Sequence, residues 1–132
     1  MTAAIVLDTG ALIALDRNDR AMWANLRIAA TDATPIYVPA AAIAQAWRDG
    51  ARQALLVRAL RECTEVPLDG NAARSAGTLC RRANTSDIVD ASIVVTAMSA
   101  ARPEAAVVLT SDPKDLHHLA NAAAATIQIQ QV

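Results

Sequence analysis

The sequence predicts an α/β fold in which a mostly parallel central sheet carries helices on both faces. Short aliphatic runs alternate with longer helical segments along the 132 residues, and no hairpin signal joins one run to the next. Strands separated by helices are typical of parallel sheets, because a parallel connection needs a crossover element. Two of the runs also end at or near an aspartate, which suits the carboxyl edge of such a sheet.

Apolar periodicity assigns the elements of the first half. The run Ala3-Ala4-Ile5-Val6-Leu7 predicts a buried strand that ends at Asp8. Ile36-Tyr37-Val38 predicts a second strand, and Pro39 fits the first turn of a helix that runs to about Arg48. The remaining helices of this half are expected near 11–16, 20–30 and 52–62.

The second half contains the most apolar helix of the chain. The segment from Ile88 to Ala101 is almost wholly apolar and predicts a buried helix. Asp69 is a good N-cap for the preceding helix, which extends to about Arg82, and Asp112-Pro113 is a strong start for a last helix. That last helix is expected over 113–120, and further strands at 65–68, 106–110 and 126–129.

Length and composition indicate one globular domain over residues 1–132. Hydrophobic residues make up 54% and charged residues 19% of the chain, which excludes a disordered protein. No stretch approaches the roughly 18 uncharged apolar residues of a membrane span. Asp8 interrupts any signal-peptide core, so we expect a cytoplasmic protein without a membrane partner. Cys63 and Cys80 have no metal-ligand spacing and are expected to be reduced.

The net charge of -1 argues neither for nor against a nucleic-acid ligand. Every basic residue except Lys114 is an arginine, and arginine suits bidentate phosphate contacts better than lysine does. A GC-rich genome would yield the same bias, together with the high alanine content and the scarcity of aromatic residues. Arginine usage is therefore only weak support for phosphate binding.

Aspartates gather where predicted strands and helices meet. Asp87 and Asp90 open the buried helix on one face, as a capping box would, and an ordinary helix start would explain Asp112 and Asp115. Capping does not explain why Asp8, Asp90 and Asp112 all fall at the expected carboxyl edge of the sheet. Grouped carboxylates repel one another, and a divalent cation relieves that repulsion. Oxygen ligands favour Mg²⁺ or Mn²⁺ over Zn²⁺, so the pattern predicts such a metal site.

Four segments of the chain match a known family in order and spacing. They are Leu7-Asp8-Thr9-Gly10-Ala11-Leu12-Ile13-Ala14-Leu15, Val38-Pro39, Asp87-Ile88-Val89-Asp90-Ala91 and Leu109-Thr110-Ser111-Asp112-Pro113-Lys114-Asp115-Leu116. In these segments the protein resembles PIN-domain ribonucleases of the VapC type, and the resemblance extends over essentially the whole chain. Such ribonucleases are the toxins of toxin–antitoxin pairs. The resemblance implies a PIN-like three-layer sandwich and a metal-dependent RNA hydrolase.

The resemblance also implies which residues form the site. The family uses four acids to hold one or two divalent ions, and by position Asp8, Asp90 and Asp112 are the catalytic metal ligands. Asp87 and Asp115 are then supporting or substitute ligands. Cleavage would leave a 3′-hydroxyl and a 5′-phosphate.

The second family acid, usually a Glu on the helix after Val-Pro, is matched here by Gln45. An amide can offer its carbonyl oxygen to a metal or to water, but it adds no negative charge and cannot act as a general base. Gln45 therefore also suits a catalytically impaired PIN-fold module that binds RNA or a protein partner.

Several other side chains are candidates for supporting roles. Thr9 and Ser111 lie beside the acids and would orient metal-bound water. The candidates to hold the RNA backbone are Arg48, Arg52, Arg81 and Arg82. The first two lie one helical spacing apart if the helix continues through Gly50. Trp23 and Trp47 are interpreted as core or interface residues rather than as base-stacking platforms.

The resemblance implies RNA as substrate, a cognate antitoxin as partner and a homodimer. A receiver domain is a rival interpretation, because it also gathers aspartates at the edge of a parallel sheet. It needs a phospho-accepting Asp at the end of a central strand. Between Tyr37 and Val66 the only Asp is Asp49, which lies in helical sequence, so this rival is disfavoured.

Overall fold

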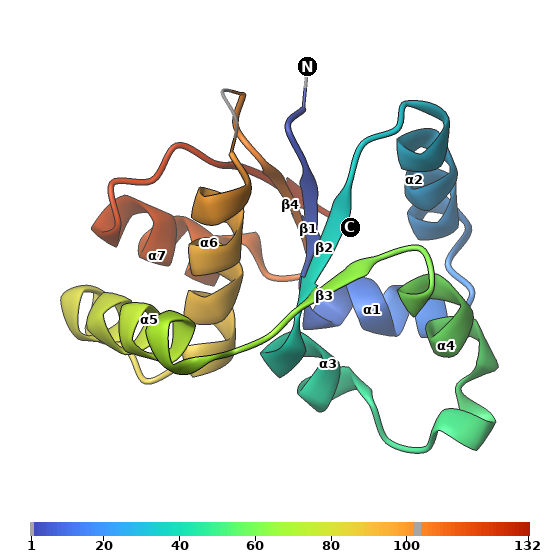
Figure 1. Ribbon diagram of the computed structural model, residues 1–132, viewed down its shortest axis with the longest axis horizontal. Helices are drawn as coiled ribbons and strands as arrows, with labels where there is room; N and C mark the ends of the chain where they lie inside the picture. Colours follow the sequence, from blue (N-terminus) through green and yellow to red (C-terminus); the bar gives the residue numbers. More distant parts are fainter. Residues whose placement is uncertain (1, 102–103) are drawn as a thin grey trace.

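The computed structural model describes residues 2–101 and 104–132, and it has the predicted architecture (Figure 1). In these residues one sheet has the strand order β3-β2-β1-β4-β5. All neighbouring strands are parallel. The strands are β1 (Ile5–Leu7), β2 (Ile36–Pro39), β3 (Thr64–Val66), β4 (Val107–Thr110) and β5 (Gln128–Gln131).

Helices cover both faces of the sheet (Figure 1). On one side lie α1 (Thr9–Asp16), α2 (Arg20–Thr31), α3 (Ala40–Ala46) and α4 (Ala54–Leu60). On the other side lie α5 (Gly70–Ala83), α6 (Ile88–Ala100) and α7 (Pro113–Ala122). The result is a three-layer arrangement, as expected for helices that connect parallel strands.

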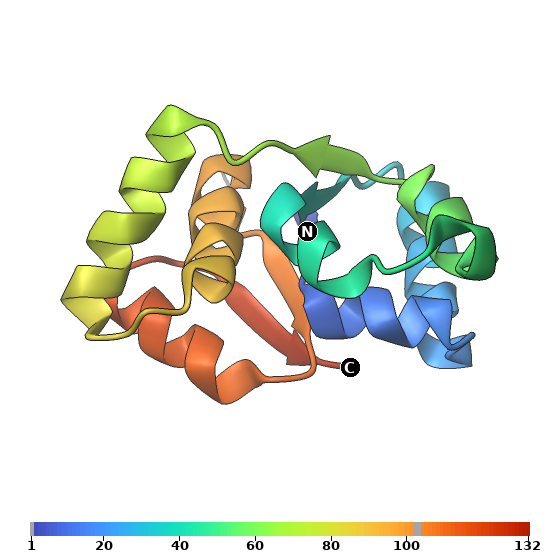
Figure 2. The same ribbon diagram turned by 90° about the horizontal axis from the view of Figure 1, so that it is seen from below.

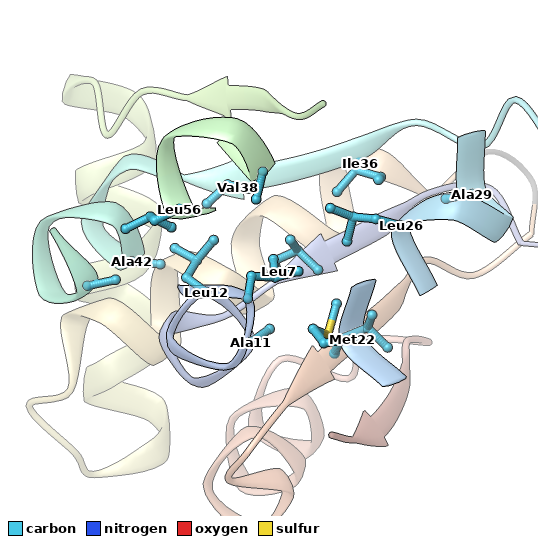
Figure 3. Packing of buried hydrophobic residues seen from close by; sticks show 14 of the residues in the cluster. Leu7, Ala11, Leu12, Met22, Leu26, Ala29, Ile36, Val38, Ala42 and Leu56 are labelled. Carbon is cyan, nitrogen blue, oxygen red and sulfur yellow. The ribbon is translucent and has the colours of Figure 1, made fainter. Parts of the chain in front are cut away.

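Two apolar clusters hold the layers together, because side chains alternate along each strand. Leu7 and Leu109 belong to the cluster under α1 to α4, whereas Val6 and Val108 belong to the cluster under α5 to α7. Figure 3 shows Leu7 of β1 packed among side chains of the first cluster. Burying a side chain of this size contributes roughly 1.5–3 kcal/mol to folding, so both faces of the sheet stabilise the fold.

The register of the central strands places the end of β1 beside the end of β4. Leu7 pairs with Leu109, so the next residues, Asp8 and Thr110, are brought together although they are far apart in sequence. Seen from below in Figure 2, the first turns of α1, α6 and α7 converge on this edge of the sheet, beside α3.

The helix after β2 ends earlier than the sequence predicts. Pro39 is the last residue of β2 and the N-cap of α3, and Trp47 is already extended, with φ -75° and ψ 130°. The side chain of Gln53 accepts hydrogen bonds from the backbone N–H groups of Arg48 at 2.8 Å and Asp49 at 2.9 Å. These side-chain bonds take the place of helical ones. The helix therefore ends two residues before the predicted Arg48, and the condition under which Arg48 and Arg52 would be one helical spacing apart is not met.

Other boundaries differ from prediction by a few residues, as is usual for fraying element ends. The expected helix over 52–62 divides into a 3-10 turn at Gly50–Arg52 and α4, while β3 begins one residue earlier and β5 two residues later than predicted. Cys63 and Cys80 are free thiols, as expected. Within the described residues, every helix is too short or too polar to cross a bilayer.

Candidate active site

Asp8 joins the end of β1 to the start of α1. Its Oδ1 accepts a hydrogen bond of 2.8 Å from the backbone N–H of Ala11, and its Oδ2 accepts one from the Thr110 hydroxyl. The residue is only 5% exposed. Burial raises the pKa of the Asp8 carboxyl above its ordinary value, and these hydrogen bonds offset only part of that rise.

The first turn of α6 supplies a pair of carboxylates. Asp87 is the N-cap, and its Oδ1 accepts from the backbone N–H of Asp90 at 3.0 Å, so the expected capping role is confirmed. Asp90 is half-buried. Burial and then the negative charge of Asp87 raise the pKa of Asp90 to about 7, with smaller contributions from Asp8 and Asp115. Capping therefore accounts for Asp87, but it does not explain why the carboxylate of Asp90 lies half-buried among other negatively charged side chains.

The start of α7 supplies a second pair. Asp112 stands at the N-cap position but makes no side-chain capping bond, so its carboxylate is not used by the helix. Its backbone N–H donates to the Thr110 hydroxyl at 2.8 Å. The hydrogen bond between the Asp112 and Asp115 carboxyl groups raises the pKa of Asp115, and the nearby charge of Asp87 adds to this effect.

These five aspartates form one electrostatically connected group, which we call the acidic cluster: Asp8, Asp87, Asp90, Asp112 and Asp115. They come from three helix starts at one edge of the sheet (Figure 2). A small hollow of about 90 Å³ is lined in part by Asp87, Asp90, Asp115 and His118. His117 and His118 are exposed on α7, and the His118 Nε2 lies 2.6 Å from the carbonyl oxygen of Ala83.

The chemistry of the acidic cluster fits a hard divalent cation. Its donors are carboxylate oxygens, and the raised pKa values of Asp8, Asp90 and Asp115 reflect burial and repulsion that a cation would relieve. Within the described residues, no three His, Cys, Asp or Glu side chains are arranged as a ready-made metal cage. The carboxyl groups instead interact as pairs within α6 and α7, so cation binding has to draw oxygens from different elements together.

Gln45 lies at the border of the acidic cluster, where the resemblance implies the second family acid. The hydroxyl of Thr9, the residue after Asp8, donates to the Gln45 Oε1 at 2.7 Å. The side-chain carbonyl oxygen of Gln45 is thus already a hydrogen-bond acceptor next to Asp8. It brings no charge to the cluster.

A close approach between the loop after β4 and the start of α1 completes the site. A Cβ added at Gly10 would lie 1.9 Å from the Oγ and 2.6 Å from the Cβ of Ser111. The glycine is therefore needed for the loop after β4 to reach the start of α1. The backbone N–H of Ser111 also contributes a hydrogen bond that lowers the pKa of Asp8, which places Ser111 beside the carboxylate as predicted.

A family model of the PIN domain matches residues 5–122 of this sequence. The chain belongs to the PIN domain family. PIN domains are generally nucleases, so the acidic cluster lies in a chain whose family is one of nucleic-acid hydrolases. No curated protein matches the sequence significantly.

Two solved structures share the fold of this PIN domain over nearly its whole length. VapBC2 from Rickettsia felis, bound to a DNA fragment from their promoter, has 14% sequence identity and a TM-score of 0.70 and covers 98% of both chains. DNA-bound VapBC from Salmonella typhimurium has 14% identity and a TM-score of 0.69, covering 99% of this chain and 98% of the other. The predicted PIN-like three-layer sandwich is confirmed.

The four arginines expected to hold RNA occupy different surroundings in this PIN domain. Arg48 donates from Nη1 to the carbonyl oxygens of Ala44 and Trp47, at 3.3 and 2.7 Å. Arg52 forms an exposed ion pair of 3.7 Å with Asp49. The other two, Arg81 and Arg82, lie exposed in the last turn of α5. Arg82 lines a hollow on the outer side of α5 and α6, and no member of the acidic cluster lines that hollow.

The two tryptophans differ in burial. Trp23 is half-buried, and its Nε1 donates to the carbonyl oxygen of Leu15 at 3.0 Å, in agreement with a packing role. Trp47 is 40% exposed, and its ring lies over Gly50.

Sequence reasoning did not identify Thr110 as a site residue. Its side chain is fully buried, and its hydroxyl contacts both the Asp8 carboxylate and the backbone of Asp112. No local sequence signal identifies it, because the contact depends on the register of two strands that lie far apart in the chain. If Leu7 pairs with Leu109, the residue after β1 must meet the last residue of β4.

Proposed function

We propose that this PIN domain is a divalent-metal-dependent endoribonuclease and the toxin of a type II toxin–antitoxin pair. The observation that carries the proposal is the grouping of Asp8, Asp90 and Asp112, with Asp87 and Asp115, at the carboxyl edge of the sheet in a chain of a nuclease family.

Each residue of the acidic cluster has a role in the proposed reaction. Asp8, Asp90 and Asp112 hold Mg²⁺ or Mn²⁺, and Asp87 and Asp115 support them. When bound, the cation supplies an activated water nucleophile and neutralises charge on the phosphate. The hydrogen bonds from Ala11 and Thr110 keep the Asp8 carboxylate oriented.

The neighbouring polar residues position water and substrate. In the proposal Thr9 and Ser111 orient the attacking water, and Gln45 offers a neutral oxygen where related enzymes place a carboxylate. Hydrolysis breaks the bond between phosphorus and the 3′-oxygen, leaving a 3′-hydroxyl and a 5′-phosphate. Without a cation, the acidic cluster repels the RNA backbone, so chelation should stop the reaction.

The partner assignment is supported by the two VapBC structures that share the fold. We extend their pairing to this chain, with a cognate antitoxin that blocks the acidic cluster and a homodimer as the toxin's assembly.

A non-catalytic PIN module is the second candidate, and Gln45 favours it. The amide leaves one carboxylate fewer than the family quartet, which lowers the charge available to hold a cation. Calorimetric titration with Mg²⁺ and Mn²⁺ separates the two candidates. If the chain is a nuclease, the wild type should bind Mg²⁺ or Mn²⁺ and this binding should depend on Asp8. A wild type that binds neither cation would favour the inert module.

The decisive experiment compares Asp8→Asn with the wild type in an RNA cleavage assay. We expect wild-type cleavage only with Mg²⁺ or Mn²⁺, and none from the variant, because the amide removes a buried negative charge from the metal site. The fold should persist, since an asparagine oxygen can still cap α1.

Asp69→Asn is the matched control. Asp69 caps α5 through the backbone N–H of Ala72 at 2.8 Å, outside the acidic cluster, so the same chemical change should leave cleavage unaltered. Undiminished cleavage by Asp8→Asn would refute the assignment of the site.

A further inference from the structure

A second charged feature lies between α2 and α4, outside the acidic cluster. A hollow of about 320 Å³ is lined by three arginines, a tryptophan and two smaller residues, which we call the arginine pocket: Asn18, Arg20, Trp23, Arg27, Leu55 and Arg58. Arg20, Trp23 and Arg27 share one face of α2, because they are spaced at three and four residues. The lining carries three positive charges and no negative charge.

Within the part of the chain that the structure describes, the three guanidinium groups of the pocket form no ion pair with a carboxylate. Among the residues that the structure describes, the one ion pair joins Arg52 and Asp49, which do not line this pocket. The carboxylates that flank it in sequence are engaged elsewhere. Asp16 accepts from the Gln53 Nε2 at 3.1 Å, and Asp19 caps α2 through the N–H of Met22 at 2.8 Å. Within the described residues, the arginines of the pocket are therefore free of ion pairs, and their guanidinium groups are open to an anionic ligand.

Trp23 gives the pocket a fixed wall. Its indole Nε1 is hydrogen-bonded to the carbonyl oxygen of Leu15, which sets the ring orientation. The guanidinium carbon of Arg58 lies 5.2 Å from the ring centroid, within cation–π range. This stack limits the freedom of a long side chain, so less entropy is lost when Arg58 binds an anion.

We propose that the arginine pocket binds the phosphodiester backbone of RNA, as a subsite separate from the acidic cluster. The proposal rests on the proposed function only for the choice of RNA as ligand. Planar guanidinium groups match phosphate oxygens bidentately, and uncompensated arginines make phosphate contacts that release counterions.

The charge distribution explains why such a subsite is needed. The chain has a net charge of -1, and the acidic cluster repels a polyanion. Affinity for RNA must then come from a local positive surface. Of the four arginines expected to hold RNA, Arg48 contacts backbone carbonyls and Arg52 is paired. Arg81 and Arg82 lie on α5, on the other side of the sheet from α1 to α4, whereas three arginines line the arginine pocket.

Helix α1 connects the two sites. It begins at the residue after Asp8 and ends at Asp16, close in sequence to Asn18 of the pocket. Its length is about 12 Å at 1.5 Å per residue. A strand of RNA held in the pocket can therefore reach the acidic cluster within a few nucleotides.

The test is a binding measurement that needs no catalysis. Fluorescence anisotropy of a short labelled RNA strand is recorded in chelator at several salt concentrations, with the wild type and an Arg20→Gln, Arg27→Gln, Arg58→Gln triple variant. We expect the triple variant to lower the slope of log affinity against log salt by about 2, at about 0.7 per lost phosphate contact. For each single variant, the ratio of wild-type to variant affinity should be about fivefold larger at 0.1 M salt than at 1 M salt.

Two further variants control for charge and for folding. Arg74→Gln removes one exposed arginine from α5, on the other side of the sheet (Figure 1), and should leave the slope unchanged. The corresponding Lys triple variant keeps the three charges and should keep the wild-type slope.

Three outcomes would overturn the proposal. The first is an unchanged slope in the Gln triple variant, and the second is a slope that falls as much in Arg74→Gln as in the triple variant. The third is a Gln triple variant that no longer binds a polyglutamate peptide bound by the wild type but binds RNA as the wild type does. The last result would assign the pocket to an acidic protein segment. Because binding is measured in chelator, failure of the metal-dependent cleavage assay would leave this result interpretable.

Discussion

At the residue scale, one hydroxyl group connects two of the proposed metal ligands. Thr110 donates to the carboxylate of Asp8 and accepts from the backbone N–H of Asp112. The side chain is fully buried, so neither group can replace the lost bond with bulk water if the hydroxyl is removed. Thr110 is therefore a positioning residue for the acidic cluster.

Replacing Thr110 with Val tests this role. We expect the free energy of unfolding to fall by about 1–3 kcal/mol, because a buried carboxylate oxygen and a backbone N–H lose their partner. The pKa of Asp8 should rise further, since the Thr110 hydrogen bond lowers it, and Mg²⁺ should bind more weakly. Urea denaturation and calorimetric titration measure these changes.

Thr96→Val is the matched control for that substitution. Thr96 is also buried, but its hydroxyl donates to the carbonyl oxygen of Ser92 within α6, where the helical bond remains. Thr96→Val should lower the free energy of unfolding by less than Thr110→Val does, and it should leave the affinity for Mg²⁺ unchanged. Equal losses in both variants would show that Thr110 has no special role.

At the element scale, the site depends on how closely three helix starts approach one another. The N-termini of α1, α6 and α7 each stabilise a nearby carboxylate by roughly 0.3–1 kcal/mol, which partly offsets the repulsion among the aspartates. The start of α1 can meet the loop after β4 only because Gly10 has no side chain.

Gly10→Ala should separate these two elements. The added Cβ overlaps Ser111, so the loop has to move, and we expect a loss of about 1–3 kcal/mol in stability together with weaker Mg²⁺ binding. Gly77→Ala in α5 is the control, since no atom lies within 4 Å of its Cβ position. It should stabilise the protein by about 1 kcal/mol. A Gly10→Ala variant with wild-type stability and Mg²⁺ affinity would contradict the close-approach argument.

At the scale of the whole molecule, charge is divided between two regions. The acidic cluster occupies the carboxyl edge of the sheet, and the arginine pocket lies between α2 and α4. In the absence of a cation, the acidic cluster makes the stability of the entire fold depend on pH, because its raised pKa values belong to the folded state alone.

The pH dependence has a definite sign. Asp90 has a folded pKa of about 7 against an ordinary value of 3.8, so the folded state binds more protons than the unfolded state between these values. Stability in chelator should therefore be greatest below about pH 4 for this group and fall as pH rises through about 7. The raised pKa values of Asp8 and Asp115 act in the same direction.

Thermal unfolding from pH 5 to 8, with chelator or with Mg²⁺, measures this effect. The melting temperature in chelator should fall with pH, and Mg²⁺ should restore it at high pH. Asp90→Asn should flatten the profile. A wild-type profile that matches that of Asp90→Asn would show that the carboxylate is not perturbed in the folded protein.

Much of the architecture follows from local patterns. The apolar runs before Asp8 and Asp112 identified two parallel strands, and the apolar segment after Asp87 identified the buried helix that carries Asp90. These patterns can be recognised in the sequence because burial of one face gives each strand or helix its own apolar periodicity, independent of the other elements. The early end of α3 was not readable, because Gln53 ends it through side-chain hydrogen bonds from beyond the helix.

The sequence by itself determined the fold class and the acids that would meet at one edge, since strand direction and apolar periodicity are local properties. Only the tertiary structure decided which partners those acids have. The bond from Thr110 to Asp8 depends on strand register, and the arginine pocket depends on α4 packing beside α2. Contacts between residues far apart in sequence leave no periodic trace in either segment, and for that reason they emerge only when the chain is folded.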